Sequence, residues 1–557
     1  MNRVKKAVRY VATAVVMVVV AGFFTFSVRD DFGLGRNMEL LVNMMRELST
    51  HYVDKLDPDK MMQDAAYGMV SSLDPYTTYL SEEDMKEFET ATTGKYGGIG
   101  ALIRKRGDYV VIAEPYKGSP ADRAGLKIGD KIVAIGKEDA KGFTTEQVSS
   151  RLKGDPNTNV KVTIENLIDG ERRTLNIKRE RIAIPGIAYS GMLNDSVGYV
   201  RHADFTDGCY DEMRNAIERL HAGGNLKGLV LDYRNNGGGI LQEAVKIVSL
   251  FTQKGTEVVS TKGRVESENK TFRTELEPLL PEIPIVVLVN GNTASSSEIV
   301  AGALQDIDRA VVMGQKSFGK GLVQSSRPIG YDAYVKMTTA KYYIPSGRCI
   351  QNVDYSEHGS EARVVADSLI REFKTRNGRK VYDGGGIMPD VPLNPQFISR
   401  FALTLYAMGI IDEFGDEYMK RHHAEPIDLR NFSISDEEYE RFVEFVKSRD
   451  VAYTSETRQV LGQLKKALEA DRFEGALANH IEDIEKELKD DTESNLRTYR
   501  DEIVESLNGN IILRYYYSEG AIEHSLPEDK EVAAAVNLLA NPAEYGEILS
   551  SRDTRRK

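Results

Sequence analysis

The feature that most constrains the fold of this 557-residue chain is a strand-like run followed at once by a helix, in residues 285–306. Five consecutive apolar residues, Ile285 to Val289, predict a strand that is buried on both faces. A turn at 290–292 leads into a run of small hydroxyl residues, and from Ile299 onward apolar and small residues recur at helical spacing. This pattern predicts an α/β domain built around a buried strand.

The hydroxyl run lies where the predicted helix begins, and Ser295 is part of it. Backbone N–H groups in the first turn of a helix have no intrahelical acceptor, so a nucleophile and the oxyanion it creates can both be stabilised there. Lys320 lies between two glycines in a loop that follows a second strand-like run, 310–313. A serine and a lysine in these places fit a Ser-Lys dyad. The alternative is that Ser295 only caps the helix and Lys320 is a solvated loop charge.

Three short motifs in this region resemble the core of the C-terminal processing peptidases, also called tail-specific proteases. They are hydroxyl-Ala-Ser-x-Ser-Glu-Ile at 293–299, Gln-Asp at 305–306 and Phe-Gly-Lys-Gly-x-x-Gln at 318–324. The resemblance implies a serine-type endopeptidase whose nucleophile is Ser295 and whose general base is Lys320. It further implies that Gln324 orients the lysine and that Asp306 belongs to the catalytic set. Thr293 stands where many members of the family have serine.

A glycine-rich segment, 233–239, follows the predicted buried strand 229–232, and residues 232–238 read Asp-x-Arg-Asn-x-Gly-Gly, which also resembles the family. The resemblance implies an oxyanion hole formed by the backbone N–H groups of Gly238 and Ser296. A nucleotide-binding loop is the rival interpretation, but neither G-x-x-x-x-G-K-[ST] nor G-x-G-x-x-G is present. A Ser-His arrangement is the alternative for the base, although no recognisable motif surrounds the histidines of this domain, His202, His221 and His358.

Residues 93–181 change to short strand-like runs separated by glycine turns, and over this length they resemble a PDZ domain. The loop Gly97-Gly98-Ile99-Gly100 opens the first such run. Backbone N–H groups of such a loop can bind a terminal carboxylate while the edge strand pairs with the peptide. We therefore expect polypeptides with free C-termini to bind there. The alternative is that the glycines only make a tight turn.

The amino terminus predicts a membrane anchor. Residues 1–9 are basic and residues 10–28 are almost entirely apolar, about the length needed to cross a bilayer. A removable signal peptide is the competitor, but the run is long for that class and ends in bulky residues without a small-x-small site. The charges around the run place residues 1–9 in the cytoplasm and the catalytic part outside it, on the periplasmic side if the source is bacterial.

The resulting architecture is multidomain, α/β and α+β. After the transmembrane anchor come a helical segment (36–92), the PDZ domain (93–181), the protease core (182–395) and an acidic C-terminal helical extension (396–557) that the core motifs do not require. The helical segment has an apolar stripe that needs a partner. The family resemblance implies that this partner is a second copy of the chain, in a homo-oligomer. The net charge of −12 argues against a nucleic-acid surface. The resemblance implies neither metal nor cofactor. The rival functions are a catalytically silent PDZ scaffold that binds C-terminal peptides, and a different acyl hydrolase on the same fold.

Overall fold

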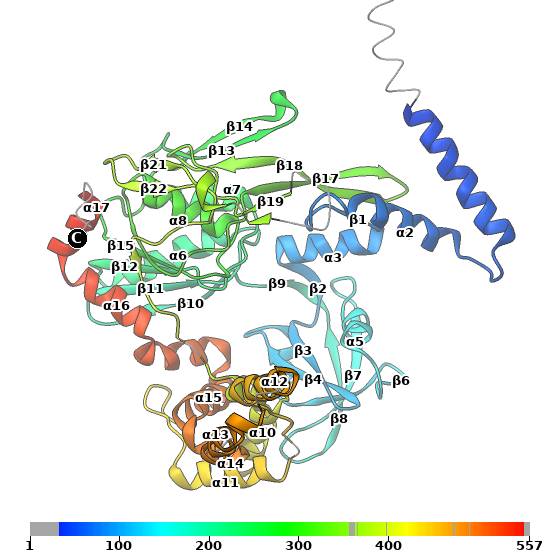
Figure 1. The fold of residues 1–557 in the computed structure, drawn as a ribbon, viewed down its shortest axis with the longest axis vertical. Helices are drawn as coiled ribbons and strands as arrows, with labels where there is room; N and C mark the ends of the chain where they lie inside the picture. The colour runs from blue at the N-terminus through cyan, green and yellow to red at the C-terminus, as the bar shows by residue number, and fades with distance from the viewer. Residues whose placement is uncertain are drawn as a thin grey trace, which may run out of the picture. The chain divides into compact units, whose positions relative to one another are not determined.

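The computed structural model describes residues 33–355, 363–364, 366–396, 398–449, 451–471, 474–488 and 491–550 (Figure 1). The predicted anchor, residues 10–28, lies outside these residues, so it stays a prediction. Within the described ranges, no helix is both long enough and apolar enough to span a bilayer. Two compact units are formed, and within the described residues the smaller one comprises 33–82, 324–338 and residue 355.

The smaller unit combines helices with a strand hairpin. Residues 33–51 are helical, and α2 (Pro58–Val70) begins after Asp57, whose side chain accepts hydrogen bonds from the first backbone N–H groups of the helix. Strand β1 (Thr78–Leu80) pairs antiparallel with residues 334–336 of β18 (Ala333–Tyr343). β18 also pairs with β17 (Leu322–Gly330), and both residues of the turn between them have positive φ, as tight hairpins require.

A six-stranded sheet in the larger unit carries the predicted buried strand at its centre. The strand order is β10-β11-β12-β15-β16-β23, antiparallel between the first two and parallel from β11 onward. The strands are β10 (Ile187–Met192), β11 (Val197–His202), β12 (Gly228–Asp232), β15 (Ile285–Val289), β16 (Val311–Gly314) and β23 (Val391–Pro392). All five residues of β15 are fully buried, which confirms the expectation from its unbroken apolar run.

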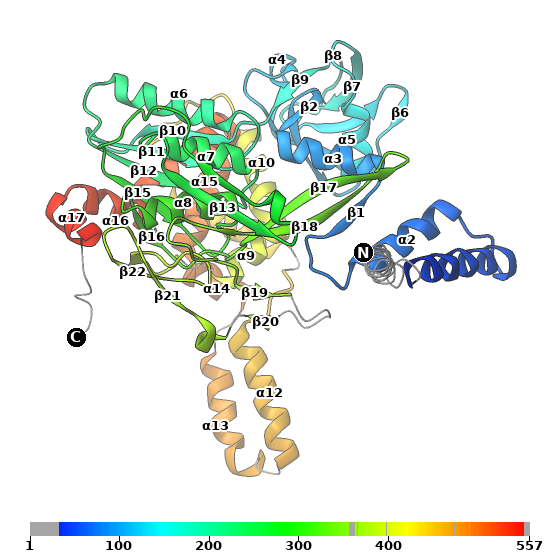
Figure 2. The ribbon, with the colours of Figure 1, turned by 90° about the horizontal axis from the view of Figure 1, so that it is seen from above.

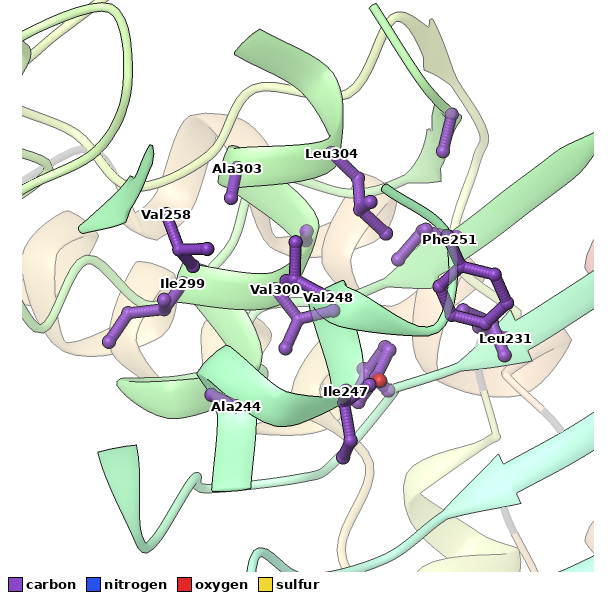
Figure 3. Packing of buried hydrophobic residues seen from close by; sticks show 14 of the residues in the cluster. Leu231, Ala244, Ile247, Val248, Phe251, Val258, Ile299, Val300, Ala303 and Leu304 are labelled. Atoms are coloured by element: carbon purple, nitrogen blue, oxygen red, sulfur yellow. The ribbon is translucent and has the colours of Figure 1, made fainter. Parts of the chain in front are cut away.

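The helices between the parallel strands cover one face of this sheet. They are α6 (Cys209–Ala222), α7 (Leu241–Ser249) and α8 (Ser296–Asp306). Because the parallel strands follow one another in chain order, right-handed crossovers place all three helices on the same side. Figure 3 shows apolar side chains of α7 and α8 packed together with Leu231 of β12 and Val258 of β13 (Glu257–Gly263), and Met213 and Ile217 of α6 belong to the same buried cluster.

The opposite face of the sheet is covered by the last two helices of the described chain, α16 (Lys530–Leu539) and α17 (Pro542–Ser550), which lie beside the strands in Figure 1. Successive strand residues point to opposite faces, so Val286 and Leu288 of β15 pack against Val532 and Leu538, whereas Val287 packs against the other helices. Residues 530–550, which the sequence grouped with the C-terminal extension, therefore complete the core of the central sheet.

The remaining elements of the larger unit's α/β part are short. The residues of β18 from 340 to 343 pair with β13, and β13 pairs with β14 (Lys270–Arg273). The others are η1 (Glu266–Glu268), β19 (Val353–Asp354), β20 (Arg363–Val364), η2 (Asp367–Leu369), β21 (Glu372–Lys374) and β22 (Lys380–Tyr382).

The segment predicted as a domain of short strands, 93–181, contains a separate antiparallel sheet with its own apolar core. The strand order is β3-β4-β5-β7-β8, with β6 on β5, and β3 lies at the edge next to α5. The strands of this sheet are β3 (Ala101–Arg106), β4 (Tyr109–Pro115), β5 (Lys131–Ile135), β6 (Glu138–Asp139), β7 (Asn159–Glu165) and β8 (Arg172–Lys178). Beside it, β2 (Lys95–Gly98) and β9 (Glu180–Ala183) pair with each other as a two-stranded antiparallel sheet. The helices are α3 (Glu82–Thr93), α4 (Pro120–Arg123) and α5 (Thr145–Leu152).

The C-terminal extension is helical, as predicted, and has its own core built mainly from α9 (Arg400–Ala407), α10 (Ile410–His422), α11 (Asp436–Lys447), α14 (Thr492–Thr498) and α15 (Arg500–Ser525). Figure 2 shows α12 (Glu456–Asp471) and α13 (Glu474–Glu487) as an antiparallel pair. A short helix, η3 (Leu526–Glu528), joins α15 to α16. Asp412 and Asp416 of α10 pair with Arg514 of α15.

Candidate active site

Three loops that carry the predicted catalytic motifs leave the same edge of the central sheet. They follow the carboxyl ends of the adjacent parallel strands β12, β15 and β16, and each contains one of the motifs singled out in the sequence. In parallel α/β sheets the carboxyl ends of the strands are where ligands bind. The sheet topology thus brings together segments that are far apart in the sequence.

The backbone of Ser295 is held in an uncommon conformation at the start of α8. Its φ of 56° and ψ of −117° lie in a region that residues with a side chain rarely adopt. Such a conformation costs on the order of 1–3 kcal/mol and persists only where the surroundings enforce it. Neighbouring hydrogen bonds enforce it here: the N–H of Ala294 donates to the carbonyl of Asn236 at 3.0 Å, and Thr293 Oγ1 donates to the carbonyl of Tyr233 at 2.9 Å.

A buried carboxylate, that of Glu298, joins the backbone of Ser295 to the loop that carries Lys320. Its Oε2 accepts the N–H of Ser295 and the N–H of Lys320, each at 2.9 Å. Its Oε1 accepts the N–H of Gly319 at 2.8 Å and Ser317 Oγ at 2.5 Å. Because the side chain is fully buried, these four donors replace its hydration. The backbones of Ser295 and Lys320, the predicted nucleophile and base, are therefore bound to one buried group.

A second buried group, the hydroxyl of Tyr342, contacts the same two residues from β18. It lies 2.5 Å from the carbonyl oxygen of Lys320 and 3.2 Å from that of Ser295. A direct bond also joins the loops, since the N–H of Phe318 donates to the carbonyl of Thr293 at 3.0 Å. The backbones of Ser295 and Lys320 thus share two buried partners.

The environment of Glu298 predicts a measurable pH dependence. Burial raises the pKa of this carboxyl from 4.5 to about 7, although the hydrogen bonds from Ser317, Lys320, Gly319 and Ser295 act to lower it. A folded-state pKa above the unfolded value contributes stability that is fully present below about pH 4.5 and is lost as the pH rises through about 7. The loss amounts to about 3 kcal/mol.

We expect Glu298→Gln to remove that pH dependence and to lower stability at every pH. A glutamine amide presents its NH2 group to two of the four donors, and each buried donor left unpaired costs about 1–3 kcal/mol. Calorimetric melting of both proteins between pH 5 and pH 8 tests this. The gap in Tm between wild type and Glu298→Gln should narrow as the pH rises, and a constant gap would contradict the assignment.

The two predicted oxyanion donors lie side by side. A Cβ placed on Gly238 would come within 2.8 Å of the nitrogen of Ser296 and 2.7 Å of the Cβ of Ser295, so only glycine fits there. Its φ of 95° requires glycine as well. The N–H of Gly238 donates to Asn236 Oδ1 at 2.9 Å in this structure. For this N–H to bind an oxyanion, the Asn236 side chain has to turn away or share it.

Gln324 and Asp306, two further predicted site residues, have partners of a different kind. Gln324 belongs to the smaller unit, where its Nε2 donates to Thr338 Oγ1 at 3.2 Å. Asp306 forms a fully buried ion pair with Arg348 at 2.8 Å and accepts the N–H of Ser346 at 2.9 Å. These contacts give Asp306 a structural partner within the larger unit. The orienting role of Gln324 stays a prediction.

Two of the three histidines considered for the base, His202 and His221, lie in the described residues, and neither has the environment of a general base. His202 is buried between the rings of Phe205 and Tyr233, and burial lowers its pKa to about 3. Its Nε2 contacts the carbonyl of Asp204 at 3.0 Å. His221 is exposed in the last turn of α6. His358 lies outside the described residues.

The predicted carboxylate-binding loop joins β2 to the edge strand β3. Gly97 and Gly98 pair with β9, and a Cβ on Gly97 would come within 2.2 Å of the carbonyl oxygen of Gly154. The carbonyls of Ile99 and Gly100 accept the N–H groups of Ala121 at 2.8 Å and Tyr116 at 2.9 Å. These bonds fix the loop beside the open edge of β3, the arrangement that peptide addition to a sheet requires.

The sequence did not predict the roles of two residues at the site, Glu298 and Tyr342. Glu298 is part of the Ser-x-Ser-Glu motif, but the motif gives no partner for its carboxylate. Tyr342 lies on a strand more than 40 residues after Ser295. Nothing in the local sequence pattern indicates that its hydroxyl contacts the backbone of Ser295. A glutamate at the third helical position, next to a predicted nucleophile, is the signal that could have been followed.

Comparison with known proteins matches three parts of the chain to described families. Residues 196–358 match peptidase family S41, residues 111–166 match a PDZ domain, and residues 401–539 match the C-terminal helical domain of a probable PDZ-protease. These ranges fall in the α/β part, the separate antiparallel sheet and the C-terminal helices respectively. The resemblance drawn from the motifs is confirmed.

Two relatives agree with these matches in sequence, one from Bartonella bacilliformis and one from Staphylococcus aureus. The carboxy-terminal-processing protease of Bartonella bacilliformis is 35% identical over 314 residues, which are 56% of this chain and 72% of that protein. A probable CtpA-like serine protease of Staphylococcus aureus is 35% identical over 315 residues, 56% of this chain and 62% of that protein. The solved photosystem II D1 C-terminal processing protease is 28% identical and covers 64% of this chain and 87% of its own, with a TM-score of 0.34.

A mixed β-sheet covered by helices, with a serine in a strained turn at its carboxyl edge, a PDZ domain and a helical extension are the parts of a PDZ-containing serine protease. The chain belongs to the carboxy-terminal-processing proteases of peptidase family S41.

Proposed function

We propose that the protein is an endopeptidase that uses Ser295 as nucleophile and Lys320 as general base, and that cleaves polypeptides near their C-termini or in unfolded segments. The observation that supports this most is the pair of buried groups shared by the two residues. Glu298 accepts both backbone N–H groups, and the Tyr342 hydroxyl contacts both carbonyls. These contacts hold together two loops whose side chains, a hydroxyl and an amine, have to come within hydrogen-bond distance for the reaction.

The chemistry is acyl transfer. The neutral amine of Lys320 takes the proton of Ser295 Oγ as this oxygen attacks the carbonyl carbon of the scissile bond. The oxyanion that forms is stabilised by the N–H groups of Ser296 and Gly238. Collapse of the tetrahedral intermediate expels the amine, which receives the proton from Lys320, and leaves an acyl-serine. Water, deprotonated by the same lysine, then hydrolyses the ester.

The PDZ domain supplies the preference for a C-terminal tail. The edge strand β3 pairs with an extended peptide, and the backbone of residues 97–100 binds the terminal carboxylate. Support for this comes from the position of β3 at the end of its sheet and of α5 alongside it. The substrate class is therefore a polypeptide with a free carboxylate and an unstructured end.

The proposal is tested by incubating the protein with an unstructured polypeptide and with a C-terminally amidated copy, and sequencing the fragments. We expect cleavage of the free-acid substrate, slower cleavage of the amidated one, and none of either by Ser295→Ala. Ser267→Ala, at an exposed serine of the same α/β part, is the control.

Three results would contradict the proposal. Equal cleavage by Ser295→Ala would exclude the nucleophile, and equal cleavage of acid and amide would exclude recognition of the carboxylate. Binding of the free-acid peptide without any cleavage by the wild type would identify a scaffold that binds C-terminal peptides.

A further inference from the structure

One carboxylate of the C-terminal extension reaches both loops that flank the nucleophile turn. Glu531 lies in the first turn of α16, and the residue is 6% exposed. Its Oε2 accepts Arg234 Nη1 at 2.7 Å, and its Oε1 accepts Gln315 Nε2 at 2.6 Å. Arg234 follows β12 and Gln315 follows β16. The two oxygens of one carboxylate therefore bind the loops on either side of the loop that carries Ser295.

The Arg234 side of this bridge leads into the predicted oxyanion loop. The guanidinium is bound by Asp232 at 2.6 Å, by Asp529 at 2.7 Å and by Glu531, two of which come from the C-terminal extension. Burial alone would raise the pKa of Asp232, but Arg234 and Arg201 hold it below its usual range. Arg234 is therefore locked among carboxylates, four residues before Gly238.

The Gln315 side leads into the loop of the proposed base. The backbone N–H of Gln315 donates to the carbonyl of Val289 at 3.0 Å, and its Nε2 also donates to the carbonyl of Leu393 at 3.1 Å. Ser317, Gly319 and Lys320, the residues bound to Glu298, follow directly. A shift of Gln315 is thus transmitted over a few residues to Lys320.

We propose that Glu531 is a positioning residue, which sets the distance between the oxyanion loop and the base loop and so makes the C-terminal extension part of the catalytic apparatus. This inference rests on the proposed peptidase function. The carboxylate is suited to the task because both of its partners are donors. A glutamine at position 531 would turn its NH2 group, which is a donor, toward either the guanidinium of Arg234 or the NH2 group of Gln315. Because the NH2 group of Gln315 is already bound to the carbonyl of Leu393, neither arrangement keeps both hydrogen bonds.

The test is Glu531→Gln in the full chain, with two controls. Glu528→Gln removes an exposed carboxylate three residues earlier. Val532→Ala weakens the packing of α16 on the sheet without touching the carboxylate. We expect Glu531→Gln to lower kcat by about 10- to 100-fold, the scale of a misplacement of about 1 Å, with KM almost unchanged. Glu528→Gln should match the wild type, and Val532→Ala should lose Tm while keeping most of its kcat.

Hydrogen exchange of peptides covering 232–239 and 315–321 gives a second measure that needs no turnover. Glu531→Gln should speed exchange in both segments, and Val532→Ala should not do so selectively. A wild-type protein that cleaves no substrate would contradict the proposed function. The exchange data would still show whether Glu531 holds the two loops in place. A Glu531→Gln protein with wild-type kcat and exchange would overturn the inference, as would an equal loss of kcat in Val532→Ala.

Discussion

Lys320→Arg is expected to lower the rate of peptide-bond cleavage by about 100- to 10,000-fold while leaving the fold intact, because it removes the general base. Arginine keeps a positive charge and a long side chain but is not deprotonated in proteins, so it cannot accept the proton of Ser295. Lys316→Arg is the matched control, since Lys316 is exposed in the same loop. Cleavage assays on the three proteins, with circular dichroism for the fold, measure the effect.

The pH profile of the wild type adds an independent check on the same residue. A free lysine titrates near 10.4, and only its neutral form is a base. We therefore expect kcat/KM to rise with pH through a single ionisation, and Lys320→Arg to lack that rise. Substantial turnover by folded Lys320→Arg would exclude the dyad. His202 would be a poor substitute, since burial lowers its pKa to about 3 and its ring packs between Phe205 and Tyr233.

The sequence predicted those parts of the molecule that depend on local patterns. The apolar run 285–289 predicts a strand buried on both faces, and the hydroxyl residues after it lie at the start of a helix, as in the structure. Gly100 and Gly238 lie in turns with positive φ, as predicted, whereas Gly97 and Gly98 belong to strand β2 and pair with β9. In each case neighbouring residues determine the conformation, so the pattern is sufficient.

The sequence could not predict contacts between distant segments. Glu298 is next to the nucleophile, but its partners at 317–320 come from another loop. The helices that cover the second face of the central sheet lie at 530–550. That this face needs covering follows only from the strand order, which places all crossover helices on the other side. Glu531 is one acid among many in an acidic helical region, and only its buried partners distinguish it.

Asp306→Asn is expected to destabilise the α/β part of the larger unit by about 3–5 kcal/mol, because it leaves the guanidinium of Arg348 buried without a counter-charge. Both side chains of the pair are fully buried. The remaining acceptors for Arg348 are neutral: Gln305 Oε1 at 2.7 Å and the carbonyl of Tyr382 at 3.0 Å. Asparagine retains an oxygen that can accept the N–H of Ser346. The loss of stability therefore measures the contribution of the negative charge of Asp306. Asp195→Asn, at an exposed aspartate, is the control.

The same variant separates a structural role of Asp306 from the catalytic role implied by the family resemblance. If the residue is structural, Asp306→Asn loses activity in proportion to the fraction unfolded, and cooling restores it. Adding Arg348→Met should then recover part of the Tm, since replacing both members of a buried pair costs less than removing one. Melting curves and cleavage rates on the single and double variants decide between the two roles. A protein with wild-type Tm and no activity would place Asp306 in the chemistry.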